Sequence, residues 1–323
     1  MARYLTGIQS SGIPHLGNIL GAIVPAIQFS KTPGNESIFF IADYHSLTTI
    51  KSAAERIHNV RSVAAAWIAF GFDYEQNILF RQSDVKQVLE LTWFLGCFTP
   101  YPMLANATSF KDKAEKLSDV NAGLFTYPVL MAADIILYDT AFVPVGKDQI
   151  QHIEMARDMA SMFNRFYKTD CLVLPEPAIQ AESMTVPGTD GLKMSKSYGN
   201  FIDIFQDDKA LRKVVMSIKT NSADLADPKD PDTDITFKLY SLIASEEEIA
   251  SLRASYLGGN FGYGAAKEIF YDKLLSHFGE ARKRYTGLMA EPEKLDAILK
   301  VGAEKASTIA DRVLERIRPL VGF

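Results

Sequence analysis

Strand-length apolar runs alternate with stretches of helical periodicity over the first two-thirds of the chain, and this alternation restricts the fold more than any other feature. Several runs are apolar throughout, as a parallel sheet buried on both faces requires. Between two of them, Ser52 and Glu55 form a capping-box pattern that opens an expected helix. The predicted fold class is therefore α/β, with a doubly wound, Rossmann-like parallel sheet. The expected strands are residues 4–8, 37–42, 78–81, 141–145 and 171–174.

The character of the sequence changes after about residue 202. Residues 220–236 hold many aspartates and two prolines, which indicates a solvated loop. Helical patterns follow, one of them opened by Ser245 and Glu248, and apolar residues keep helical spacing from Leu295 to Ile317. We therefore expect two domains, an α/β domain over residues 1–202 and an all-α domain over residues 203–323.

Composition excludes several classes of protein. The 323 residues, 47% hydrophobic, suffice for one large core and a smaller one. No apolar run reaches membrane-spanning length and no signal-peptide pattern is present, so we expect a soluble, cytoplasmic protein. Cys97 and Cys171 lack a CxxC partner or clustered histidines, so neither a disulfide framework nor a metal site is expected. The net charge of −5 gives no general attraction to nucleic acid.

A glycine-rich segment, residues 6–18, separates the first expected strand from the first expected helix. Gly7, Gly12 and Gly17 would let a ligand approach the backbone, and a helix N-terminus favours an anionic phosphate. On these residues alone, a turn without a ligand is an equally good interpretation. A nicotinamide site is disfavoured because the spacing is not GxGxxG and no ribose-binding acid follows a second strand.

A second segment, residues 189–200, carries Lys193 and Lys196 on a glycine-flanked loop. Two lysines on a mobile loop can follow a triphosphate and neutralise the charge that builds on a departing pyrophosphate. The alternative is an ordinary basic surface loop.

A third segment, residues 126–138, places Tyr127, Met131 and Asp134 on one helical face, at i, i+4 and i+7. An acid on an otherwise apolar face needs a hydrogen-bond partner. An indole N–H is a donor-only group that a buried carboxylate can accept, while the other two side chains pack against the ring. From spacing alone, a core stripe whose Asp134 caps a backbone group is slightly favoured.

These three segments together resemble the motifs of a known family. His15-Leu16-Gly17-Asn18 resembles the His-x-Gly-His motif of class I aminoacyl-tRNA synthetases, and Lys193-Met194-Ser195-Lys196-Ser197 is similar to their second ATP motif. Asn18 in the last place is familiar in the tryptophan-specific members, and residues 127–138 look like the helix with which that group binds tryptophan. The resemblance runs nearly end to end and implies a HUP-type catalytic domain followed by a helical anticodon-binding domain.

The resemblance implies three sets of site residues. The tryptophan-binding set is Leu5, Gln9, His45, Tyr127, Met131, Asp134 and Gln149. The ATP-binding set is Gln9, Ser10, Ser11, His15, Gly17, Asn18, Gly146, Lys147, Asp148, Lys193, Met194, Ser195, Lys196 and Ser197. The catalytic set is Lys193, Lys196, Asn18 and Lys111.

Four of these positions depart from the family pattern or have a simpler structural explanation. Lys147 stands where the family usually has Glu, which puts a ribose contact from this side chain in doubt, and Ser10 stands where many relatives carry Pro. Asp148 could equally be a simple helix N-cap. Lys111 belongs to an alternation of lysines and acids that is usually just a solvated helix surface.

The implied activity is that of a bacterial-type tryptophan–tRNA ligase. Tryptophan and ATP, with Mg²⁺ carried by the ATP phosphates, would give tryptophanyl-adenylate and pyrophosphate, and tRNA(Trp) would receive the amino acid. The family implies a homodimer. A tyrosyl-tRNA synthetase, a non-catalytic RNA-binding paralogue and a nucleotidyltransferase of the same superfamily are the alternatives.

Overall fold

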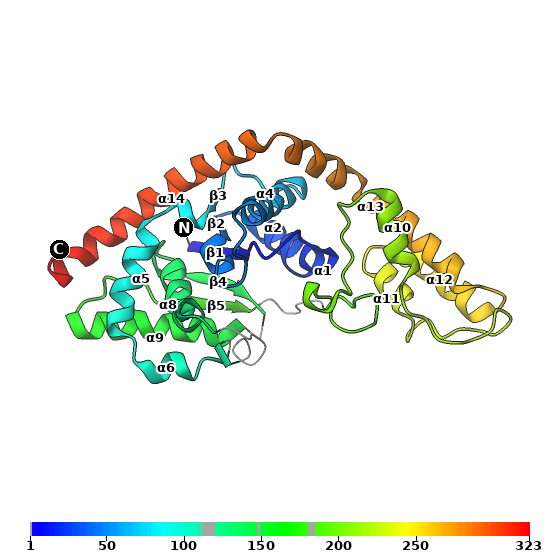
Figure 1. Cartoon of the computed structure of the whole chain (residues 1–323), viewed down its shortest axis with the longest axis horizontal. Coiled ribbons are helices and arrows are strands. Elements are labelled where there is room, and N and C mark those ends of the chain that lie inside the picture. The colour runs from blue at the N-terminus through cyan, green and yellow to red at the C-terminus, as the bar shows by residue number, and fades with distance from the viewer. Residues whose placement is uncertain (1, 109, 112–119, 147–148, 180–184) are drawn as a thin grey trace.

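The computed structural model describes residues 2–108, 110–111, 120–146, 149–179 and 185–323 (Figure 1). Its strands are β1 (Ala2–Gln9), β2 (Asn35–Ala42), β3 (Ile78–Arg81), β4 (Phe142–Val145) and β5 (Glu176–Ile179). The first part of the chain also holds α1 (Leu16–Asn18), the π-helix η1 (Ile19–Ile23), α2 (Val24–Ser30), α3 (Asp43–Ser46), α4 (Ala53–Ala69), the 3₁₀ helix η2 (Gln82–Asp84), α5 (Gln87–Phe98), α6 (Tyr101–Ala105), α8 (Ala122–Ile136), α9 (Ile150–Tyr167) and the 3₁₀ helix η4 (Lys196–Tyr198). The second part holds α10 (Asp208–Met216), α11 (Ile235–Ser241), α12 (Glu246–Gly258), α13 (Tyr263–Ala290) and α14 (Pro292–Val321).

The strands form one parallel sheet in the order β3-β2-β1-β4-β5. The predicted α/β class with a doubly wound sheet is confirmed. The chain builds outward from β1 through β2 to β3, then crosses back to place β4 on the other side of β1. The carboxyl ends of β1 and β4 therefore mark the switch point, where an open α/β sheet leaves a crevice for a ligand.

The last strand lies later than predicted. Residues 171–174 are not a strand, and β5 begins at Glu176. Asn164 of α9 accounts for the difference, because its side chain accepts from the N–H of Leu172 and donates to the carbonyl of the same residue. The N–H and carbonyl of Leu172 are therefore not available for hydrogen bonds to a neighbouring strand. The other four predicted strands lie within the observed β1, β2 and β3 or overlap β4.

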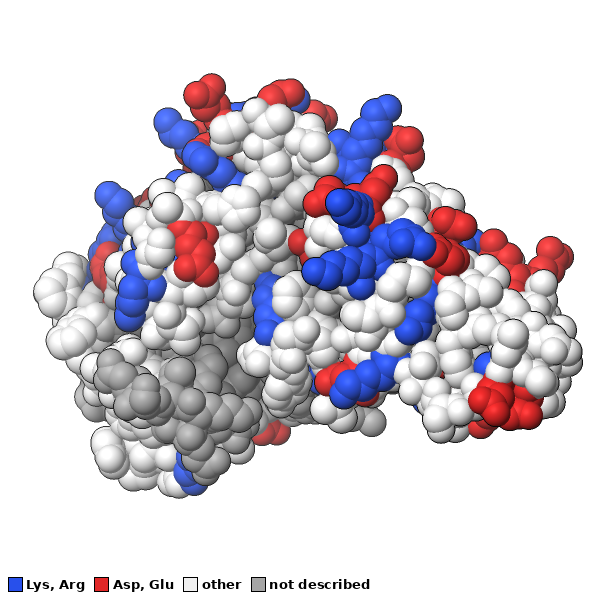
Figure 2. Space-filling view, turned by 45° about the vertical axis from the view of Figure 1, so that its right-hand side comes forward, with Lys and Arg blue, Asp and Glu red and all other residues white. Residues whose placement is uncertain are grey.

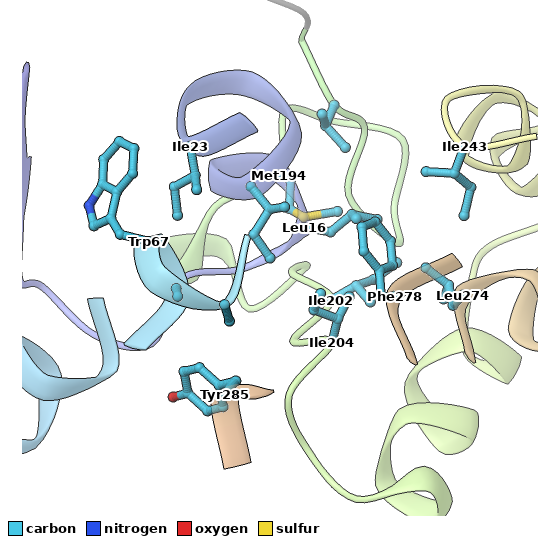
Figure 3. Close-up of a cluster of buried hydrophobic side chains, with 14 of the residues drawn as sticks. Leu16, Ile23, Trp67, Met194, Ile202, Ile204, Ile243, Leu274, Phe278 and Tyr285 are labelled. Carbon is cyan, nitrogen blue, oxygen red and sulfur yellow. The ribbon is translucent and has the colours of Figure 1, made fainter. Parts of the chain in front are cut away.

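Two hydrophobic clusters cover the two faces of the sheet. Along β2, Phe39 and Ile41 point to one face, while Ile38 and Phe40 point to the other, as the pleat requires. The first face is packed by α1, α2 and α4, and its cluster continues through Met194, Ile202 and Ile204 into α10–α13 (Figure 3). The second face is packed by α5, α8, α9 and the last part of α14. One core therefore joins the sheet to the helical second part of the chain.

The last helix, α14, returns from the helical part to the sheet, and Figure 1 shows it arching over the molecule. It packs along β3, the strand at the edge of the sheet, where Gly302 lies against the backbone of Leu79. Arg61 of α4 pairs with Asp296, and Arg318 pairs with Glu90 of α5. Residues 203–323 hold helices and loops, and the last helix, α14, packs against both the helical part and the sheet.

Gly302 permits this close packing, and its replacement tests it. A Cβ at Gly302 would overlap the carbonyl oxygen of Leu79, whereas a Cβ at Gly287 of α13 would meet no neighbour within 4 Å. We expect Gly302→Ala to lower the free energy of unfolding by about 1–3 kcal/mol through overpacking. Gly287→Ala should raise it by about 0.5–1 kcal/mol, because alanine favours a helix. Urea denaturation of both variants measures these changes. A denaturation midpoint of Gly302→Ala equal to that of the wild type would contradict the close contact between Gly302 and Leu79.

Candidate active site

A cavity of about 480 Å³ opens at the switch point of the sheet, within the range of pockets that bind small molecules. Leu5, Gly7 and Gln9 line it from alternate positions of β1. Gly7 is required there, because a Cβ would overlap the ring of Phe40 on the neighbouring strand. The rest of the wall is Phe40, Ala42, His45, Tyr127, Met131, Asp134, Ile135, Val143, Val145, Gln149, His152 and Ile153.

This cavity brings together every residue predicted to bind tryptophan. Those seven side chains come from β1, α3, α8 and the residue before α9, which are distant in sequence. Tyr127, Met131 and Asp134 share one face of α8, as their spacing predicts. The wall is mainly apolar, with polar groups at Gln9, Gln149 and Asp134.

Asp134 lines the cavity and is only 1% exposed. Its Oδ2 lies 2.8 Å from His45 Nε2, and Gln82 Nε2 lies 2.8 Å from both carboxylate oxygens. Burial raises the pKa of Asp134, and the hydrogen bonds from His45 and Gln82 oppose that rise. The partners of Asp134 in the described part of the chain are thus side chains, not the capped backbone group that spacing favoured.

Two residues at this site, Gln82 and His152, were not predicted from the sequence. Gln82 is the first residue after β3, and its position at the carboxyl end of a parallel strand was the available signal. His152 lines the cavity one helical turn after Gln149, and its Nδ1 lies 2.7 Å from Gln149 Oε1. The roles of both residues come from contacts in the folded protein, which no motif in the sequence indicates.

The glycine-rich segment after β1 is built around His15. Its Nδ1 accepts from the N–H of Asn18, while Asn18 Oδ1 accepts from the N–H of His15, so the two residues form a reciprocal cap on α1. His15 Nε2 therefore carries the proton of the neutral ring. Ser10 is buried, and its hydroxyl lies 2.8 Å from that of Ser46. The Ser10 side chain faces the core, which leaves only its backbone to meet a ligand.

The second predicted ATP segment lies directly against the first, although about 180 residues separate them. Met194 is 4% exposed, and its sulfur accepts from the N–H of Gly17 at 3.2 Å. The side chain of Lys196 extends over the turn at Gly12. A Cβ at Gly12 would lie only 2.6 Å from the lysine Nζ. Gly12 has a φ of +139°, which favours glycine. Met194 is thus the anchor of the loop, and Lys196 is the cation held over the turn.

Asn200 holds the loop in shape. Its Oδ1 accepts from the N–H of Ser195 at 2.8 Å, and its Nδ2 donates to Asp190 Oδ1 at 2.7 Å and to the carbonyl of Lys193 at 3.2 Å. Ser195 in turn accepts from the N–H of Ser197. This role of Asn200 could not be predicted from the sequence, because the three hydrogen bonds of its side chain run to ordinary loop residues.

Comparison with known proteins agrees with this geometry. The family model for class I tRNA synthetases (W and Y) matches residues 1–279. A tryptophan–tRNA ligase of Fusobacterium nucleatum is 44% identical over 323 residues, covering 100% of this chain and 98% of that protein. A crystal structure of the Campylobacter jejuni tryptophanyl-tRNA synthetase, complexed with ADP and tryptophan, is 43% identical, with a TM-score of 0.93 over 99% of this chain and 100% of that chain. The chain belongs to this class I synthetase family. The resemblance inferred from the motifs is confirmed.

In this class I synthetase, two residues with shifted pKa values, Lys196 and His15, lie where the two predicted ATP segments meet. Burial lowers the pKa of Lys196 to about 8, against an opposing effect of Asp203. Burial, and then the nearby charge of Lys196, lower the pKa of His15 to about 4. At neutral pH Lys196 is therefore mainly a cation, and it lies beside the neutral imidazole of His15.

The remaining predicted residues of the synthetase lie around this site or outside it. Gly146 follows β4, and its carbonyl accepts from the N–H of Gln149, while Lys147 and Asp148 lie outside the described residues. Ser11, Lys193 and Ser197 are exposed. Lys111 is exposed, donates to Asn106 Oδ1, and does not line the cavity. No cluster of three or more His, Cys, Asp or Glu placed to hold a metal ion occurs among the described residues.

The contact between the two segments can be tested by titrating His15. If the lysine charge helps to keep the ring neutral, Lys196→Met should raise the His15 pKa above about 4, while burial should keep it below 6.5. NMR titration of the histidine ring protons measures this shift. Lys193→Met, which removes the exposed lysine of the same loop, is the control and should leave His15 unchanged. An unchanged His15 pKa in Lys196→Met would show that Lys196 does not lie over this turn.

Proposed function

We propose that this protein is a tryptophan–tRNA ligase, which activates L-tryptophan with ATP and transfers it to tRNA(Trp). The observation that carries the proposal is a largely apolar cavity with a buried carboxylate in its wall, placed beside two docked ATP segments. The names of the full-length relatives support the same activity.

Tryptophan would be selected by Asp134. A carboxylate offers about four lone-pair positions, so Asp134 can accept an indole N–H in addition to its bonds from His45 and Gln82. Tyr127 and Met131 would pack against the ring from the same helical face. Phenylalanine has no such donor and would leave the buried acceptor short of a partner. Gln9 and Gln149 lie on the same cavity, where they would meet the amino and carboxylate groups.

ATP would lie along the two docked segments, with Mg²⁺ arriving on its phosphates as part of the substrate. Ser11, His15 and Gly17 with Asn18 would border the nucleotide. Gly146 and Asp148 would hold the ribose, and Lys147 would contribute its backbone rather than its side chain. The tryptophan carboxylate, already ionised at neutral pH, attacks the α-phosphorus, and the bond to the bridging oxygen breaks as pyrophosphate leaves. No general base is needed. Lys193 and Lys196 would stabilise the leaving group, and a well-placed donor contributes about 3 kcal/mol in such sites.

Transfer then needs a tRNA-binding surface, and we assign the anticodon to residues 203–323. Figure 2 shows lysine and arginine side chains gathered across the middle of one face of the molecule. Lys209 and Lys213 of α10, with Lys283 and Arg284 of α13, are exposed. Such local basic groups can bind a phosphate backbone despite the net negative charge. Since the tRNA partner is cytoplasmic, we place the enzyme there. No helix in the described part of the chain is long and apolar enough to cross a membrane.

We also propose that the enzyme is a homodimer that associates through the catalytic part. Leu89, Trp93 and Cys97 follow one another at i, i+4 and i+8 on the outer face of α5, and all three are exposed. Trp93 is 73% exposed. A helix face of this kind is typical of a protein–protein contact.

Amino-acid selection gives the decisive test of the function. The wild-type protein should catalyse tryptophan-dependent exchange of pyrophosphate into ATP, with tyrosine and phenylalanine as poor substrates. Asp134→Ala should lose that preference, by as much as about 10⁴-fold, because the designed acceptor is gone. ATP binding should survive. Asp158→Ala, an exposed acid of α9, is the control and should keep the wild-type preference. Unchanged tryptophan affinity in Asp134→Ala would remove Asp134 from the site.

Association can be tested at the exposed face of α5. Trp93→Glu should convert the dimer to a monomer in sedimentation experiments, because a buried charge at an apolar contact is costly. Leu257→Glu, on the exposed side of α12, is the matched control and should leave the dimer intact. A Trp93→Glu dimer as stable as the wild type would place the interface elsewhere.

A further inference from the structure

Gln82 uses both ends of its side-chain amide inside the protein. It is 1% exposed and lies in η2, directly after β3. Its Oε1 accepts from the N–H of Tyr44 at 3.0 Å, and its Nε2 lies 2.8 Å from each oxygen of Asp134. The amide therefore joins the carboxyl ends of β2 and β3 to Asp134, near the C-terminal end of α8.

The two hydrogen bonds fix which way the amide points. A flipped amide would place Oε1 against the Asp134 carboxylate and would leave the N–H of Tyr44 facing an NH₂ group. Both arrangements are unfavourable for buried groups. Tyr44 thus orients Gln82, and Gln82 in turn faces both carboxylate oxygens, which restricts rotation of the Asp134 carboxylate. His45, next to Tyr44 on α3, holds Oδ2 from another direction.

The charged state of Asp134 depends on the same contacts. Burial and the neighbouring Asp43 carboxylate raise the pKa of Asp134, whereas His45 and Gln82 lower it by hydrogen bonding. The Tyr138 phenol also faces this charge, and its pKa is raised by burial and by Asp134. Asp43 is itself held by the N–H and hydroxyl of Ser83, so it does not bond to Asp134. An ionised, oriented carboxylate is the form that accepts an indole N–H.

We propose that Gln82 is a positioning residue for amino-acid selection, which holds the Asp134 carboxylate in the orientation that reads the indole N–H. This inference rests on the proposed tryptophan-activating function. It differs from a purely structural role, because a structural role would affect all amino-acid substrates alike. Positioning of Asp134 should matter only for a substrate that carries the N–H donor.

Two substrates and two matched variants separate these roles. The substrates are tryptophan and 3-benzothienylalanine, in which sulfur replaces the indole N–H. Gln82→Glu keeps the size of the side chain and an acceptor for Tyr44, but removes the donor to Asp134. Gln87→Glu is the control, because Gln87 also donates to a carboxylate, Asp311 Oδ1 at 2.8 Å, between α5 and α14.

Pyrophosphate exchange then gives kcat/KM for each amino acid. In Gln82→Glu, kcat/KM for tryptophan should fall by at least about tenfold, while that for the sulfur analogue should change by less than about threefold. The KM for ATP should stay within about twofold of the wild type, since the hydrogen bonds of Gln82 given above run to Asp134 and Tyr44. Gln87→Glu should leave the preference for tryptophan over the analogue at the wild-type value.

Each other outcome has a distinct meaning. An equal loss for both amino acids, or an unchanged preference, overturns the positioning role while the wild-type exchange still supports the proposed function. If the wild type shows no tryptophan-dependent exchange, the proposed function fails and this inference fails with it. If Gln82→Glu does not fold, Gln82→Met is measured for the same ratio, and a preference equal to that of the wild type overturns the inference.

Discussion

The sheet reverses its direction of growth at β1, and the whole site depends on that reversal. Because β2 and β4 both neighbour β1, the connections that follow them leave on opposite sides, and a crevice remains at the carboxyl ends. Gly7 keeps that crevice open by allowing Phe40 to lie beside β1. Leu5 and Gln9 then reach the cavity from the same strand. A different strand order would separate the walls that surround the buried carboxylate.

The second constraint is the contact that joins the loop of residues 189–200 to the rest of the molecule. Met194 is buried in the cluster that also contains Leu16 of the glycine-rich segment after β1, and Ile202 and Ile204 at the start of the helical part (Figure 3). The N–H of Gly17 donates to its sulfur. The loop that carries Lys196 is therefore placed by hydrophobic burial at one end and by the hydrogen bonds of Asn200 at the other. The shared cluster gives the helical part a physical connection to the loop that carries Lys196.

Much of this could be predicted from the sequence, for reasons that the residues make clear. Buried parallel strands are apolar runs, so four strands were predicted near their observed places, and the spacing of Tyr127, Met131 and Asp134 gave their common face. The prediction of the fifth strand was wrong because the side chain of Asn164, in the preceding helix, forms hydrogen bonds with the N–H and carbonyl of Leu172. Local pattern carries no information about such a contact.

The same limit applies to the polar network. Asp134 was recognisable as an acid on an apolar face, but Gln82 was not, since its importance comes from packing between segments 52 positions apart. The close approach of Gly302 to Leu79, which draws the last helix onto the sheet, is equally invisible in the sequence. Long-range contacts therefore set both the finer chemistry of the site and the place of α14.

A crystal structure of the complex with tryptophan would show whether the buried carboxylate at the switch point reads the indole. We expect the ring to pack against Tyr127 and Met131, with the indole nitrogen about 3 Å from an oxygen of Asp134 and with Gln82 still bonded to that carboxylate. Tryptophan bound outside the cavity, or inside it with the indole nitrogen away from Asp134, would contradict this role of Asp134.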